Sequence, residues 1–295
     1  MPALRIALFG TASRFSLLAL QELAAHGLVA AVVLWQPTYN LLRASVLRIP
    51  GLRRMSSFER LARERSIPVV LATRSNQAAV TDRLRMARPD LICVAIYPRR
   101  ISPELIDLAP LGAINVHPSL LPRHRGPLPL FWTYHADDRT AGVTVHYMSQ
   151  ILDAGDIIMQ EGFPLLRGYP SVKLDEDLAK RGALLLRSAA EALAHGQASR
   201  TGQDARAATY APLVRPGIPM VRFGEWDVER VWHFLAALSP RYCEPLTDNR
   251  GHSALYRGVT GFERGHFATP GTIEAVDHGW KLHCRGGTVL LAKSA

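Results

Sequence analysis

Residues 4–35 read LRIALFGTASRFSLLALQELAAHGLVAAVVLW. The apolar run Leu4–Phe9 is typical of a buried strand, and Gly10–Ser13 has the composition of a tight turn. In Phe15–His26 the leucines recur at the spacing of one helix face, and a glycine follows at the C-cap position. A second apolar run occupies Leu28–Trp35. The segment therefore predicts a strand, a helix and a second strand, the unit from which parallel sheets are built.

The same alternation continues through the first two thirds of the chain. Further strands are predicted at Pro68–Leu71, Asp90–Ile96, Gly112–His117, Ala141–Tyr147 and Ile157–Phe163. Further helices are predicted at Ser57–Arg65, Gln77–Ala87, Pro103–Leu108, Pro129–Ala136 and Lys173–His195. This pattern predicts a Rossmann-like α/β fold, an open and mostly parallel sheet with helices on both faces.

The amino-acid composition changes after the long predicted helix Lys173–His195. Gly196–Gly224 is rich in glycine, proline, alanine and threonine, which is typical of a linker. A helix is predicted at Asp227–Leu238, followed by short apolar runs that include Gly271–Val276 and Thr288–Leu291. We predict a catalytic domain at residues 1–200, a linker at 201–225, and a small, mostly β, barrel-like domain at 226–295.

The amino-acid composition excludes several classes of protein. With 48% hydrophobic and 20% charged residues, the 295-residue chain is not wholly disordered. Its three cysteines are far apart, so they form neither a disulfide framework nor a CxxC metal site, and a reduced, cytoplasmic protein is expected. The apolar run Leu28–Trp35 is much shorter than the ~20 residues that span a bilayer, so no membrane partner is expected.

The net charge of +10 comes from 35 basic and 25 acidic residues, and only four of the basic residues are lysines. Arginine binds phosphates through two parallel hydrogen bonds, which suits nucleic acids or phosphorylated ligands. A host whose codon usage favours arginine explains the same composition. Residues 41–65 alone hold seven arginines and two glutamates, so half of the net charge lies in this basic loop.

Three polar residues are candidates for catalysis. Asn115 and His117 are two apart at the end of a predicted strand, so their side chains share one face, at the sheet edge where ligands bind. Asp153 lies in the loop before the next strand, where its carboxylate would orient the imidazole and favour its charged form. Taken alone, a capping asparagine and a structural histidine are the usual explanation of Asn115 and His117, and a turn aspartate is the alternative for Asp153. His146 is interpreted as a surface histidine on a strand, with a supporting role behind the catalytic residues as the alternative.

Four blocks of sequence resemble the family of formyltransferases that use 10-formyltetrahydrofolate. The blocks are NVHPSLLP at 115–122, RG at 125–126, GVTVH at 142–146 and LDAGDII at 152–158. They occur in the order and spacing of the family. The resemblance covers about residues 4–195. A looser resemblance extends from Tyr210 to Ile273, where the branches that act on methionyl-tRNA and on amino sugars have a small C-terminal barrel. The family includes enzymes that formylate methionyl-tRNA, amino sugars and glycinamide ribonucleotide.

The resemblance implies that Asn115, His117 and Asp153 are catalytic. A primary amine attacks the formyl carbon on N10 of the folate, and an oxyanion develops on the formyl oxygen. Protonated His117 and the Asn115 amide donate hydrogen bonds to that oxygen. Asp153 keeps His117 charged and helps to move a proton from the amine to the leaving nitrogen. No metal is required, and no set of histidine, cysteine and aspartate residues has a metal-binding spacing.

Binding residues also follow from the resemblance. The candidates for binding the folate are Arg100, Ile101, Met148, Gln150, Leu152 and Asp153. The candidates for binding the acceptor are Gly10, Thr11, Ser13 and Arg125. Core packing is an equally good interpretation of Ile101. The turn Gly10–Ser13 offers N–H groups to an anion, and a helix N-cap is the alternative.

The acceptor is harder to predict. Gln36-Pro37, the basic loop and the C-terminal domain favour the branch that acts on initiator methionyl-tRNA. However, Thr38–Leu42 replaces the Asp-Arg-Pro-Ala-Gly-Arg-Gly run expected there, and the chain stops at Ala295, before the tail of that branch. His124 and Pro127-Leu128 also stand where that branch has a tryptophan and small residues. We therefore favour a small-molecule amine, such as an amino sugar or a biosynthetic amino acid derivative, with methionyl-tRNA as the alternative.

Two further hypotheses come from other classes. One is a folate-binding or RNA-binding protein without catalysis, against which the intact Asn115, His117 and Asp153 argue. The other is a hydrolase that releases formate from the same folate. We expect an additional N-terminal domain in such a hydrolase, whereas Met1 directly precedes the first predicted strand. Association into a homodimer is left open.

Overall fold

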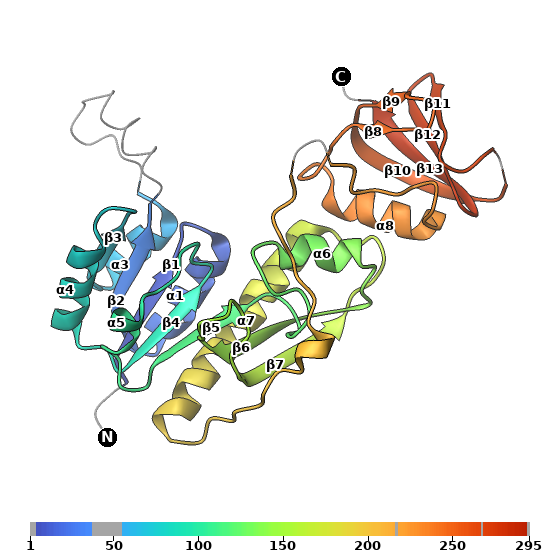
Figure 1. Cartoon of the computed structure of the whole chain (residues 1–295). Helices are drawn as coiled ribbons and strands as arrows, with labels where there is room; N and C mark the ends of the chain where they lie inside the picture. Colours follow the sequence, from blue (N-terminus) through green and yellow to red (C-terminus); the bar gives the residue numbers. More distant parts are fainter. Residues whose placement is uncertain (1–3, 37–54, 216–217, 267, 294–295) are drawn as a thin grey trace, which may run out of the picture. The chain divides into compact units, whose positions relative to one another are not determined.

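The computed structural model describes residues 4–36, 55–215, 218–266 and 268–293 (Figure 1). Pro37, Thr38–Leu42 and the part of the basic loop up to residue 54, which holds Arg48, Arg53 and Arg54, lie outside these residues. Among the helices that are described, none combines the length and the apolar character needed to cross a membrane.

Seven strands form the main sheet, in the order β3-β2-β1-β4-β5-β6-β7 (Figure 1). They are β1 (Ile6–Gly10), β2 (Val29–Trp35), β3 (Val69–Ala72), β4 (Leu91–Ala95), β5 (Ala113–His117), β6 (Thr140–Tyr147) and β7 (Ile157–Pro164). The pairings among β1 to β5 are parallel, and β6 runs antiparallel to β5. The predicted open, mostly parallel sheet is confirmed.

Helices cover both faces of this sheet. The helices in this part of the chain are α1 (Arg14–Ala25), α3 (Ser57–Glu64), α4 (Gln77–Ala87), α5 (Pro103–Ile106) and α7 (Ser171–Ala194). Leu84 of α4 and Leu105 of α5 pack in one apolar cluster with Phe9 of β1. On the other face, Gly182 of α7 lies so close to Val116 of β5 that a Cβ atom there would be 3.1 Å from its methyl group. The predicted helices on both faces are therefore present.

One row of paired residues crosses the sheet and shows where it becomes polar. Val33 pairs with Phe9, Phe9 with Val94, Val94 with Asn115, and Asn115 with His146. Residues that are paired in register point to the same face of a sheet. The row is apolar on β2, β1 and β4 and polar on β5 and β6, so these last two strands place polar side chains beside the apolar cluster.

The chain divides into two compact units. The N-terminal unit holds residues 1–127, 142–162 and 175–210, and the C-terminal unit holds 128–141, 163–174 and 211–295. In the C-terminal unit, Phe131 of α6 (Pro129–His135) packs edge-on against Phe234 of α8 (Val228–Leu238), with ring centroids 5.4 Å apart. The predicted domain boundaries at residues 200 and 225 stay predictions.

The strands of the C-terminal unit form a four-stranded antiparallel sheet in the order β10-β13-β12-β11 and a two-stranded pair. The strands are β8 (Leu246–Thr247), β9 (Ser253–Ala254), β10 (Tyr256–Arg264), β11 (Ile273–Val276), β12 (Gly279–Cys284) and β13 (Gly287–Lys293). A small, mostly β region after the main sheet is therefore confirmed.

Residues 201–210 are packed on the N-terminal unit, although their composition predicts a linker. Thr201 forms a β-bridge with Ile157 at the start of β7, and Tyr210 forms one with Arg125. Ala205–Ala207 makes a short 3-10 helix between the two bridges. The contacts are backbone hydrogen bonds together with side-chain hydrogen bonds of Gln203 and Thr209, and composition does not reveal either kind. We call residues 201–210 the strap.

Candidate active site

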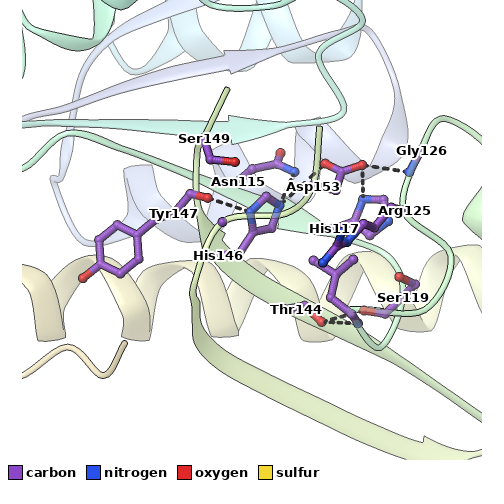
Figure 2. Close-up of polar contacts among 12 residues, drawn as sticks. Asn115, His117, Ser119, Arg125, Gly126, Thr144, His146, Tyr147, Ser149 and Asp153 are labelled. Carbon is purple, nitrogen blue, oxygen red and sulfur yellow. Dashed lines mark hydrogen bonds and ion pairs between the residues drawn. The ribbon is translucent and has the colours of Figure 1, made fainter. Parts of the chain in front are cut away.

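The three residues predicted to be catalytic lie together in the N-terminal unit (Figure 2). Asn115 and His117 extend from β5, and Asp153 reaches them from the loop that precedes β7. A fourth residue, His146 of β6, completes the cluster. His117 and Asp153 are both buried, with side chains 6% and 9% exposed, so charges on them are poorly screened by water.

His117 uses one ring nitrogen to hold its position and presents the other to Asp153. Its Nε2 atom lies 2.9 Å from the backbone oxygen of His124. Because a carbonyl oxygen can only accept, Nε2 carries a hydrogen and donates it. Nδ1 lies 3.7 Å from Oδ2 of Asp153, which is too long for a hydrogen bond but close enough for charge attraction. Protonation of Nδ1 therefore places a positive charge beside the carboxylate.

Asp153 is held at the site by its own loop. Its φ of 53° is in the left-handed region, typical of a tight turn. Two residues later, a Cβ atom on Gly155 would lie 1.8 Å from the backbone oxygen of Tyr147, so only glycine lets the loop approach the end of β6. The Gly126 N–H donates to Oδ2 of Asp153 at 2.8 Å. The carboxylate is thus fixed between His117 and His146, whose Nε2 lies 3.7 Å from Oδ1.

His146 is not the surface histidine that the sequence predicts, because its residue is only 2% exposed. Its Nδ1 lies 2.8 Å from the backbone oxygen of Tyr147 and donates to it. Burial, assisted by the charges of His117 and Arg125, lowers the pKa of His146 to about 4. The ring is therefore neutral near pH 7, and Nε2 is an acceptor. The sequence favours the surface interpretation over a supporting role because the burial of His146 depends on its antiparallel pairing with Asn115.

Asn115 is oriented by His146. Its Nδ2 lies 3.1 Å from Nε2 of the neutral histidine, and that nitrogen can only accept. The partner therefore assigns which end of the amide faces β6. An amide nitrogen carries two hydrogens, so one is used by His146 and the second is available to a ligand oxygen.

The residues predicted to bind folate do not all lie in one place. Ile101 is buried in the apolar cluster of the sheet, and Met148 packs against that cluster. Arg100 is exposed and lines a pocket together with Ile101. Gln150 and Leu152 are exposed on the loop that precedes Asp153. The structure thus brings Ile101 and Met148 to one cluster, and the roles of all these residues in binding stay predictions.

The pocket lies at the carboxyl ends of β1 to β4 and joins aromatic rings to positive charge. Tyr97 meets the rings of Phe9 and Trp35 edge-on, with centroids 5.2 and 6.0 Å apart. The guanidinium of Arg99 lies 5.7 Å from the centroid of Trp35. Arg74 and Arg100 also line the pocket, and no acidic side chain is among the described residues that line it. Such a lining suits a ligand with a flat ring and a negative charge.

The residues predicted to bind the acceptor have structural contacts of their own. Ser13 caps α1 by accepting a hydrogen bond from the N–H of Ser16. The N–H of Thr11, next to Gly10, donates to the Ser16 hydroxyl at 3.0 Å. Arg125 is only 5% exposed and donates to Gln203. Their roles in binding an acceptor stay predictions. Within the described parts of the chain, no three histidine, cysteine or acidic side chains are grouped as ligands for a metal ion.

The sequence of the chain is similar to those of known formyltransferases. The protein family described as "Formyl transferase" matches residues 4–190. The methionyl-tRNA formyltransferase of Syntrophus aciditrophicus is 32% identical over 294 residues, which cover 99% of this chain and 91% of that protein. The methionyl-tRNA formyltransferase of an Anaeromyxobacter species (strain K) is 36% identical over 292 residues, which cover 98% of this chain and 90% of that protein.

A solved structure has the same fold along the whole chain. It is the N-formyltransferase from Helicobacter canadensis in complex with folinic acid and dTDP-3-aminofucose. It matches 99% of this chain and 100% of its own, with a TM-score of 0.70 and 14% sequence identity. At that identity the likeness concerns the fold alone. The resemblance drawn from the four sequence blocks is confirmed.

Proposed function

The chain belongs to the formyl transferase family, and we propose that it moves the formyl group of 10-formyltetrahydrofolate to the amino group of methionyl-tRNA. The chemistry rests on one observation, the buried cluster of Asn115, His117, His146 and Asp153 at the end of β5. The acceptor rests on the relatives that are 32% and 36% identical along nearly the whole chain. The small-molecule amine favoured from the sequence becomes the second candidate.

The first step is attack of the acceptor nitrogen on the formyl carbon. A new C–N bond forms, and negative charge develops on the formyl oxygen. Two donors in the cluster suit that charge: the second amide hydrogen of Asn115, and Nδ1–H of protonated His117, since Nε2–H is already used by His124. One such donor is typically worth about 2.7–4 kcal/mol of transition-state stabilisation.

The second step breaks the bond between the formyl carbon and N10 of the folate. The acceptor nitrogen must lose a proton, and N10 must gain one. We infer that Asp153, which accepts a hydrogen bond from the N–H of Gly126 at 2.8 Å, takes up that proton through a water molecule and returns it to N10. Its negative charge also stabilises protonated His117. Formyl-methionyl-tRNA and tetrahydrofolate are then the products, and no proton is gained or lost overall.

His146 supports this chemistry without touching the reacting atoms. In its neutral form it accepts from Asn115 and keeps the amide nitrogen, rather than the amide oxygen, turned toward the cluster. If the amide were reversed, an acceptor would face the developing negative charge. We infer that the unusually low pKa of His146 serves to keep this orientation at neutral pH.

The pocket at the carboxyl ends of β1 to β4 suits the folate. 10-formyltetrahydrofolate joins a fused ring and an aminobenzoyl group to the carboxylates of glutamate. The apolar surface formed by Ile101 and Met148 lies on the same sheet face as Asn115, and the arginines lie farther along the carboxyl edge. We infer that the ring system lies along Ile101 and Met148 and that the glutamate carboxylates reach Arg99 and Arg100.

The function is tested by mixing the protein with 10-formyltetrahydrofolate and a panel of amines: methionyl-tRNA, uncharged tRNA, a nucleotide-linked amino sugar and free amino acids. Release of tetrahydrofolate is followed by absorbance, and formylated products are identified by mass spectrometry. We expect formylated methionyl-tRNA and one tetrahydrofolate per product. If none of the amines causes release of tetrahydrofolate, the proposed chemistry is contradicted.

The second candidate acceptor is a small-molecule amine. It is favoured by Thr38–Leu42, which departs from the sequence expected in the tRNA branch. The same panel separates the two candidates, because a small-molecule enzyme would formylate the amino sugar or the amino acids and leave methionyl-tRNA unchanged.

A further inference from the structure

The side chain of Gln203, in the strap, joins the two loops that carry the cluster. Its Nε2 donates to the backbone oxygens of Asp153 at 3.0 Å and of Gly155 at 2.7 Å. Its Oε1 accepts from Nε and Nη2 of Arg125 at 3.1 and 2.7 Å. An amide has two donor hydrogens and two acceptor lone pairs, so Gln203 uses its full hydrogen-bonding capacity on these partners.

Arg125 lies between the two residues that hold the cluster from the other side. The backbone oxygen of His124 accepts from Nε2 of His117 at 2.9 Å, and the N–H of Gly126 donates to Oδ2 of Asp153 at 2.8 Å. A shift of Arg125 would therefore move both contacts. Through Gln203, the loop of Arg125 and the loop of Asp153 are tied to each other as well as to the cluster.

The strap is anchored on both sides of Gln203. Thr201 and Ile157 exchange two backbone hydrogen bonds, at 2.8 and 3.0 Å. Thr209 accepts from the N–H of Arg125 at 2.9 Å through its backbone oxygen. Its hydroxyl accepts from the N–H of His124 at 2.8 Å. A side chain held between two fixed points can fix the position of its own partners.

The neutral amide at position 203 also has an electrostatic consequence. Arg125 carries a positive charge, is only 5% exposed and hydrogen-bonds to the neutral amide of Gln203. A carboxylate at position 203 would cancel that charge, and it would repel the backbone oxygens of Asp153 and Gly155. The residue type present is thus the one that satisfies both loops.

We propose that Gln203 is a positioning residue for formyl transfer, which holds Asp153 and the loop of Arg125 in the arrangement that the reaction requires. The strap is then part of the active-site structure rather than a passive connection. This inference rests on the proposed function for its kinetic test, so a second test is chosen that needs no turnover.

The kinetic test compares Gln203→Ala and Gln203→Glu with a matched control. In Gln203→Glu the carboxylate keeps the size of the side chain and its contact with Arg125 but removes both donated hydrogen bonds. We expect kcat to fall about ten- to a hundredfold in both variants while KM for each substrate stays within about threefold, because small misplacement of catalytic groups slows the chemical step.

The control is Gln160→Ala. Gln160 also donates two hydrogen bonds from its amide, to the backbone oxygen of Leu121 at 2.9 Å and to the hydroxyl of Thr144 at 2.8 Å, and neither goes to Asp153. We expect its kcat within about twofold of wild type. An equal loss in Gln160→Ala, or a change of KM with kcat intact in Gln203→Ala, would overturn the inference.

A double substitution tests whether Gln203 and Arg125 act together. If they form one unit, Arg125→Met combined with Gln203→Ala should be no more than about threefold slower than the slower single variant, because effects within one hydrogen-bonded unit do not add. Full multiplication of the two reductions in kcat would show independent roles and would contradict the bridge.

Hydrogen exchange supplies the test that needs no turnover. The N–H of Gly126 donates to Asp153, so its exchange reports how well the two loops are held together. We expect its protection to fall at least about tenfold in Gln203→Ala and to stay unchanged in Gln160→Ala. Unchanged protection in Gln203→Ala would overturn the inference. If the wild-type protein transfers no formyl group, the proposed function fails, and this comparison alone decides the role of Gln203.

Discussion

The amide nitrogen of Asn115 lies 3.1 Å from Nε2 of His146, across the antiparallel pair of β5 and β6. A buried, neutral histidine thus decides which end of the amide faces the cluster. Because the carboxylate of Asp153 lies between His146 and His117, Asn115, His117 and His146 belong to one group of contacts. Substituting these residues one at a time measures what each contributes to turnover and stability.

Substitution of His117 should stop the reaction without unfolding the protein. We expect His117→Ala to lower kcat by about 10²–10⁴-fold, because the variant lacks a hydrogen-bond donor and its proton. His195→Ala, which removes an exposed histidine beyond the end of α7, should keep wild-type turnover. Thermal unfolding of both variants shows whether they are folded. Near-normal turnover in folded His117→Ala would refute the assignment.

Substitution of Asp153 should slow turnover more than it weakens folate binding. In Asp153→Asn the negative charge beside His117 is removed while the size of the side chain is kept, and we expect kcat to fall at least about 10²-fold. The folate dissociation constant, measured by calorimetry, should change far less. Asp156→Asn is the control, since Asp156 is partly exposed and pairs with Arg200. An effect on folate affinity alone would contradict an electrostatic role.

Protein stability should fall as the pH is lowered from 6.5 to 4. Burial holds the pKa of His146 and of His233 at about 4, whereas an unfolded histidine takes up its proton near 6.5. Between these values the unfolded chain binds more protons, so each group costs at most about 1.4 kcal/mol of unfolding free energy per pH unit. Above pH 6.5 the contribution of both groups to stability is fully present.

The variant His146→Gln isolates one of the two contributions. Its amide oxygen still accepts from Asn115 but does not titrate, so the slope of unfolding free energy against pH should become shallower, with the share of His233 remaining. Urea unfolding at a series of pH values measures the slope. An unchanged slope between pH 4 and 6.5 would show that His146 takes up its proton in the folded state as easily as in the unfolded chain.

The basic loop should matter if the acceptor is tRNA. Replacing Arg48, Arg53 and Arg54 with alanine should weaken binding of methionyl-tRNA and reduce the salt dependence by about one unit of slope for each phosphate that is no longer neutralised. Replacing the exposed Arg83, Arg85 and Arg206 removes the same charge elsewhere and is the control. Equal effects of the two triple variants would indicate that only net charge matters.

The sequence predicts the main sheet well because its strands are continuous apolar runs between helices with regular leucine spacing. The strands β1, β4 and β5 are buried along nearly their whole length, so periodicity and length are enough to place them. The strand β10 is different, because Gly258 and Gly261 interrupt its pattern and its burial does not alternate. Pairing with β13 makes it a strand, and that pairing is not visible in the local sequence.

The candidate site could also be predicted only in part, because some of its residues are brought together by long-range pairing. Asn115, His117 and Asp153 could be predicted because they stand in long, ordered blocks of sequence. A supporting role for His146 is only the less favoured interpretation of the sequence, because its burial follows from register with β5. Gln203 lies 50 residues from Asp153 in a segment of linker-like composition, and only folding brings it to the cluster. Long-range pairing, rather than local propensity, decides both.

The most direct test of the central claim is a competition. Wild-type protein is given 10-formyltetrahydrofolate with equal concentrations of methionyl-tRNA and a nucleotide-linked amino sugar, and products are identified by mass spectrometry, with His117→Ala run in parallel. We predict formylated methionyl-tRNA, one tetrahydrofolate for each product, and no product with His117→Ala. Formylated amino sugar as the main product would contradict the proposed acceptor. Equal product with His117→Ala would contradict the site itself.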